Sequence, residues 1–125
     1  MQLKLEPIPD RLAICRLEPD EELPSWVSGD FVSLTRTKEE LSIVCRQELV
    51  PEEILCEQDW RGLRVVGQLD FTLVGIIASL TSTLAERGVS VFVVSTYDTD
   101  YLLIKEESFA VAKSALAEVG HTINE

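Results

Sequence analysis

The feature that most restricts the fold is a change of hydrophobic period between residues 74 and 94. Residues 74–85 carry apolar side chains at helical spacing, and Gly88 just beyond them is a typical helix stop. Residues 89–94 are almost all β-branched or aromatic, as in a central strand. An amphipathic helix followed by a buried strand is therefore predicted. The apolar positions of this helix are Val74, Ile77, Ala78, Thr81, Leu84 and Ala85.

The flanking segments extend this order on both sides. Residues 60–69 are expected to form a strand, and Asp70 is placed to cap the helix after it. A second apolar strand is expected at 101–104. A second helix, with a buried stripe over 109–119, is expected to stop at Gly120. The second half of the chain is therefore predicted as strand, helix, strand, strand, helix.

The first half shows a similar order with shorter helical segments. Strands are expected at 11–17, 31–36 and 41–46, where apolar residues alternate or cluster between turn signals. One helical turn is expected at 23–27, and a short helix or a turn at 51–54, because each segment has a proline near its start.

The two halves are each too small to bury a core alone. We expect an N-terminal module with shortened helices at 1–60 and a C-terminal module at 61–125, arranged in tandem. Helices on one face of antiparallel sheets, as in ferredoxin-like βαββαβ folds, suit this α+β order.

Charge and hydropathy indicate which partners and which cellular location to expect. It carries 22 Asp and Glu against 11 Lys and Arg, a net charge of −11. Such a surface repels phosphate backbones and anionic lipids, so neither a nucleic acid nor a membrane is expected as a partner. No apolar run is long enough to cross a bilayer, and no signal peptide opens the chain. We therefore expect a cytoplasmic protein.

Residues that carry chemistry are few. Cys15, Cys45 and Cys56 have no metal-site spacing and are expected to be reduced, mostly buried thiols. His121 is the single histidine and, because it follows Gly120, is expected at the surface. No phosphate-binding glycine loop and no paired acid and base are visible. The chain is therefore predicted to have no catalytic residues, metal or cofactor, and not to be an enzyme.

Several longer stretches resemble a known family. Residues 67–80, 84–92 and 95–104 resemble an ACT domain, and more narrowly the CASTOR-type cytosolic arginine sensors of animals and similar small bacterial proteins. Residues 31–37 and 39–44 resemble the same subfamily. The phrases Ser-Leu-Thr-Arg-Thr and Ser-Thr-Tyr-Asp-Thr-Asp are the most specific parts of the match.

The resemblance implies a βαββαβ fold that binds an amino acid between paired domains, in a homodimer. Its ligand site would comprise residues near the start of the helix and in the loop after the second strand: Gly75, Ile76, Thr96, Tyr97 and Asp100. The arginine sensors place an acidic side chain near the helix start. Ala78 and Ser79 stand there in this chain, so the resemblance does not extend to arginine specificity.

The same residues suit an α-amino acid on chemical grounds. Backbone N–H groups at a helix start between Thr72 and Gly75 would meet the carboxylate. Asp98 and Asp100 would meet the ammonium group, beside the Thr96 hydroxyl and the Tyr97 ring. Purely structural roles suit some of these residues equally well, since a glycine at 75 also permits close helix packing and aspartates are common turn residues.

The sequence thus predicts a regulatory or sensor protein that binds a small molecule, with an amino acid as the expected class of ligand, and that has a possible protein partner. The alternative is a structural or protein-interaction module that dimerises through its sheets and binds no ligand.

Overall fold

The computed structural model describes residues 2–67 and 74–125, and the chain divides into two compact units. Met1–Pro9 and Arg61–Glu125 form one unit, which we call the helical unit. Asp10–Trp60 form the other, the inserted unit, because it interrupts the sequence of the first. The prediction of two tandem modules divided at residue 60 stays a prediction.

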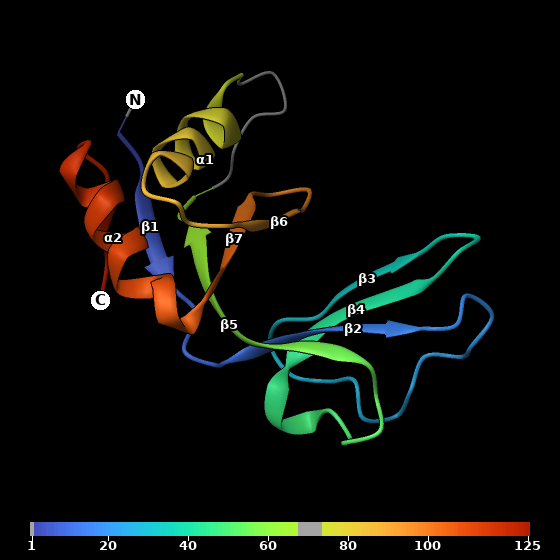
Figure 1. Cartoon of the computed structure of the whole chain (residues 1–125). Helices are drawn as coiled ribbons and strands as arrows, with labels where there is room; N and C mark the ends of the chain where they lie inside the picture. Colours follow the sequence, from blue (N-terminus) through green and yellow to red (C-terminus); the bar gives the residue numbers. More distant parts are fainter. Residues whose placement is uncertain (1, 68–73) are drawn as a thin grey trace. The chain divides into compact units, whose positions relative to one another are not determined.

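The helical unit contains a mixed sheet and two α-helices (Figure 1). The strands pair in the order β6-β7-β5-β1-β8. The β1–β5 and β6–β7 pairs are antiparallel, but β1 and β8 run parallel. The prediction of a purely antiparallel sheet was therefore wrong, because an additional strand, β1, lies between β5 and β8. The elements are β1 (Lys4–Pro7), the second half of β5 (Cys56–Val65), α1 (Ile76–Glu86), β6 (Phe92–Ser95), β7 (Asp100–Lys105), a 3-10 turn (Glu106–Ser108), α2 (Phe109–Glu118) and β8 (Thr122–Ile123).

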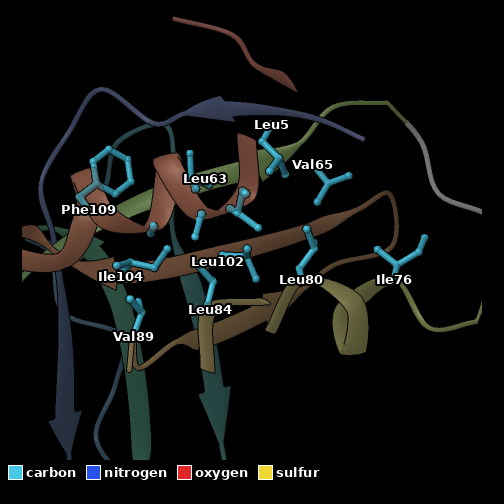
Figure 2. Close-up of a cluster of buried hydrophobic side chains, with 13 residues drawn as sticks. Leu5, Leu63, Val65, Ile76, Leu80, Leu84, Val89, Leu102, Ile104 and Phe109 are labelled. Carbon is cyan, nitrogen blue, oxygen red and sulfur yellow. The ribbon is translucent and has the colours of Figure 1, made fainter. Parts of the chain in front are cut away.

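The core of the helical unit is a cluster of buried side chains from both helices and from the sheet (Figure 2). The helices lie in contact with each other and cover one face of the strands. A shared apolar layer of this kind is what holds an α+β domain together. Its strand members include Leu5, Leu63, Val65, Leu102 and Ile104, and its helix members include Ile76, Leu80, Leu84, Phe109, Ala112 and Leu116.

Helix α1 begins later than its hydrophobic pattern predicts. Gly75 is the N-cap and has a left-handed backbone (φ 81°), so Val74 precedes the helix and is 85% exposed. The predicted cap, Asp70, lies outside the described residues. The buried side is formed by Ile76, Leu80 and Leu84, spaced four residues apart. Leu84 was in the predicted stripe, whereas Ile76 and Leu80 were not; they are buried because they pack into the core cluster of the helical unit.

Two short strands and a buried histidine were not predicted. β1 and β8 are short, and they pair with each other across almost the whole chain. Their pairing carries His121 inward, where it is 5% exposed and its Nδ1 accepts a hydrogen bond from the Leu3 N–H at 3.1 Å. The prediction of a surface histidine was therefore wrong. Burial lowers the pKa of His121, since it disfavours the charged imidazolium.

The inserted unit is an antiparallel sheet in the order β3-β4-β2-β5. Its elements are β2 (Leu12–Leu17), β3 (Ser33–Arg36), β4 (Leu41–Arg46), a 3-10 turn (Gln47–Leu49) and the first half of β5. The described residues of this unit contain no α-helix. The two proline segments form single turns, which were among the predicted alternatives, and hydrogen bonds from Val27 N–H to Pro24 O and from Ile54 N–H to Pro51 O, both 3.2 Å, close these turns.

Candidate functional site

The first part of the candidate site is the start of α1. The Gly75 carbonyl accepts the first helical hydrogen bond, from the Ser79 N–H at 2.9 Å. The N–H groups of a first helical turn have no partner within the helix, and glycine has no side chain that could cap them. A Cβ built at Gly75 would meet no heavy atom of the described residues within 4 Å. Close packing therefore does not require glycine here, whereas the positive φ favours it.

The second part is the four-residue turn that joins β6 to β7. Ser95 pairs with Asp100, and the turn between them is closed by the Thr96 N–H, which donates to the Thr99 carbonyl at 2.8 Å. The Thr96 hydroxyl donates to the same carbonyl at 3.1 Å and accepts from the Thr99 N–H at 3.3 Å. The two threonines at its ends therefore fix the shape of this turn.

A buried hydrogen bond attaches this turn to the sheet. The Thr99 side chain is 4% exposed, and its hydroxyl donates to the Val65 carbonyl, at the end of β5, at 2.7 Å. Val65 also belongs to the same buried cluster as Ile76, the first residue of α1. Figure 2 shows Val65 and Ile76 at one end of the cluster, away from Phe109. The helix start and the β6–β7 turn therefore lie at the same end of the helical unit.

The predicted site residues differ in how far they are exposed to solvent. Tyr97 is 74% exposed, Thr96 and Asp98 are also exposed, and Asp100 is partly buried at the start of β7. Ile76 is 7% exposed, so its side chain belongs to the core and only its backbone is a candidate for ligand contact. Thr72, the remaining predicted residue, lies outside the described residues.

Thr99 is a residue of the site that the sequence pattern did not reveal. The sequence placed Thr99 in the polar loop 95–100 without a role, yet its hydroxyl anchors the β6–β7 turn to β5. A signal was present, because threonines at the first and last positions of a four-residue turn are placed to bond each other's backbone.

Metal sites and membrane spans are two further classes of functional feature. In the described parts of the chain, no group of three or more His, Cys, Asp or Glu side chains is arranged to hold a metal ion. Among the same residues, no helix has the length and apolar character needed to span a lipid bilayer.

Sequence comparison gives matches over both units. A family model described as an ACT domain matches residues 55–118, and a second model, described as an N-terminal domain, matches residues 10–53. The human protein named cytosolic arginine sensor for mTORC1 subunit 1 is 33% identical over an alignment of 107 residues, and the match covers 77% of this chain and 32% of that protein. The chain thus spans about a third of the length of this curated relative.

Solved structures of similar fold include a bacterial protein and a regulatory subunit. A crystal structure of a protein from Agrobacterium tumefaciens has a TM-score of 0.93 and 35% identity, and the match covers 99% of this chain and 93% of that one. The regulatory subunit of aspartate kinase from Thermus thermophilus has a TM-score of 0.65 and 12% identity, with 91% and 95% covered. The second likeness concerns the fold alone.

Proposed function

The chain belongs to the ACT domain family, and from that premise we propose that it binds a free amino acid and regulates another protein without catalysing a reaction. The observation that supports the proposal is that two candidate segments lie at the same end of the helical unit. One is the helix start at Gly75, and the other is the turn that Thr99 anchors to Val65. The regulatory fold of the relatives and the name of the human relative, an arginine sensor, support it.

The two segments offer complementary chemistry to a zwitterion. The N–H groups of the first turn of α1 and the positive end of the helix dipole suit the ligand carboxylate. Asp98 and Asp100 supply carboxylates for the ammonium group, and such charge-assisted hydrogen bonds are stronger than neutral ones. The Thr96 hydroxyl and the Tyr97 ring would then border the ligand. The side chain of the ligand stays undefined, because Ala78 and Ser79 offer no acid for a guanidinium.

We extend the proposal to a cytoplasmic homodimer whose second copy completes the site. Val74 and Tyr97 are the most exposed large hydrophobic residues described, at 85% and 74%; Val74 directly precedes the helix start and Tyr97 lies in the β6–β7 turn. Apolar side chains this exposed beside a polar site suit an interface that closes over a ligand. The dimer would then present a different surface to its protein partner when the ligand is bound.

A thermal-shift screen of the twenty amino acids tests the function directly. A ligand present at a hundred times its Kd stabilises the folded state by about 2.7 kcal/mol, so its binding raises the melting temperature by several degrees. The amino acid that does so is then compared with its carboxamide and its N-acetyl derivative. Both derivatives are expected to lose the shift, because each removes one charge of the zwitterion.

The variant Asp100→Asn is expected to abolish the shift, whereas the matched acid-to-amide change Glu86→Gln, at the other end of α1, is expected to keep it. No shift from any amino acid would contradict the proposal. A stable dimer by light scattering in that case would favour the alternative of an interaction module without a ligand.

A further inference from the structure

The inserted unit gathers all three cysteines of the chain on one face of its sheet. Cys15 lies on β2, Cys45 on β4 and Cys56 at the start of β5. The β2–β4 register pairs Cys45 with Ala13, and the β2–β5 register pairs Cys56 with Cys15. Directly paired residues share a face, as do alternate residues of one strand, so the three thiols point to the same side. Cys15 and Cys45 belong to one buried cluster, and Cys56 packs against it.

The pair Cys15 and Cys56 has the backbone geometry of a disulfide site. The Arg16 N–H donates to the Leu55 carbonyl at 2.9 Å, which makes Arg16 and Leu55 a hydrogen-bonded pair. The neighbouring pair, Cys15 and Cys56, is therefore a non-hydrogen-bonded pair, in which the Cα atoms are about 4.5 Å apart and the side chains lie closest. Disulfides span Cα separations of about 4.4–6.8 Å. The typical Cα separation of a non-hydrogen-bonded pair therefore falls within the range that a disulfide spans.

Cys45 is less well placed for a bridge to Cys15. The residue opposite Cys15 on β4 is Ile43, so Cys45 is a diagonal neighbour. Diagonal neighbours in a sheet are about 7–8 Å apart, beyond the separation that a disulfide tolerates. The register thus selects Cys56 as the partner of Cys15.

Access distinguishes the three thiols as well. Cys15 and Cys45 are 1% and 0% exposed, whereas Cys56 is only partly buried. A hydrogen bond to Cys45, together with burial, raises the pKa of Cys15. A dissolved oxidant meets Cys56 first, since oxidation requires an accessible sulfur and Cys56 is the most exposed of the three.

We propose that the Cys15–Cys56 pair is a reversible redox modification site, which a hydroperoxide converts to a disulfide through Cys56. The Cys56 sulfur attacks one peroxide oxygen of H₂O₂, the O–O bond breaks, and a sulfenic acid and one water form. The Cys15 sulfur then attacks the Cys56 sulfur, the S–O bond breaks, and a second water leaves with the Cys15 proton. Two thiols are oxidised by two electrons, and one peroxide is reduced. The thiol pair belongs to the inserted unit, so its oxidation does not depend on the proposed amino acid site.

The test is peroxide treatment of the reduced full-length chain, followed by alkylation under denaturing conditions and peptide mass mapping. The number of free thiols is expected to fall from the three in the sequence to one, with loss of two hydrogen atoms. The mapped bridge joins Cys15 to Cys56, and dithiothreitol restores all thiols. The variant Cys45→Ser is expected to form the same bridge, whereas Cys56→Ser is expected to form none.

Several outcomes would overturn the proposal: three thiols that survive the peroxide, a bridge between Cys15 and Cys45, a bridge between two chains, or accumulation of Cys56 sulfinic acid with Cys15 still free. The mapping of the unsubstituted chain decides among these outcomes without any variant. The result therefore does not depend on whether a substituted chain folds.

Discussion

Replacement of Thr99 by valine tests how the β6–β7 turn is held on the sheet. Valine keeps the shape of threonine but removes the hydroxyl that donates to the Val65 carbonyl at 2.7 Å in a 4% exposed site. A buried acceptor left without its donor costs about 1–3 kcal/mol. The added methyl group returns about 0.8 kcal/mol through burial. We therefore expect Thr99→Val to lower the free energy of unfolding by about 0.2–2.2 kcal/mol.

Urea unfolding measures the global loss, and amide hydrogen exchange at Thr96 measures the local one. The Thr96 N–H closes the turn, so its protection factor is expected to fall about tenfold for each 1.4 kcal/mol of local destabilisation. Thr99→Ser is the matched control, because it keeps the hydroxyl. It loses a methyl group worth about 0.8 kcal/mol globally, but the local protection of Thr96 relative to the rest of the chain is expected to remain. Unchanged stability and Thr96 protection in Thr99→Val would refute this account of the turn.

Substitutions at His121, Gly75 and Gly62 test the surrounding structure by urea unfolding. Because folding lowers the pKa of His121, its contribution to the free energy of unfolding is complete above the unfolded pKa of about 6.5 and declines as the pH falls through that value. The variant His121→Asn keeps an acceptor for the Leu3 N–H but does not titrate in this range. Between about pH 7.5 and 5.5 the variant should therefore lose less stability than the unsubstituted chain. An equal loss in both proteins would contradict this. Gly75→Ala should lower the free energy of unfolding by about 1–2 kcal/mol, because the left-handed backbone at this position strains an alanine, and Gly75→Asn should lower it less. Equal stability of the unsubstituted chain and both variants would argue against this strain. Gly62→Ala should cost about 1–3 kcal/mol, because its Cβ would lie 2.6 Å from Ile8 Cδ1, and Ile8→Val should recover part of that loss in a double-mutant cycle.

Local patterns predicted much of the secondary structure. The strand at 41–46 was predicted with the bounds that β4 has. Its apolar residues follow the polar residues 37–40 and end at the charged Arg46. The helices α1 and α2 were predicted from their apolar spacing, although α1 was started too early. The helix start was predicted between Thr72 and Gly75, and the positive φ of Gly75 places the boundary at the last of these positions.

Non-local pairing accounts for the larger omissions. β1 presents the short pattern Lys4, Leu5, Glu6, Pro7, which is not distinctive by itself and becomes a strand because β5 and β8 pair on either side of it. The burial of His121 follows from the same pairing. For the candidate site, residue chemistry pointed to the helix start and the Thr96–Asp100 segment, but the anchoring role of Thr99 depends on Val65, thirty-four residues earlier in the chain. No local pattern contains that contact.

Amide chemical-shift mapping during titration with the stabilising amino acid tests the central claim most directly. The account predicts that the signals of residues 75–78 and 96–100 move together in a saturable manner, while those of the inserted unit away from β5 stay in place. Binding that moves signals in the inserted unit and leaves both of these segments unchanged would contradict it.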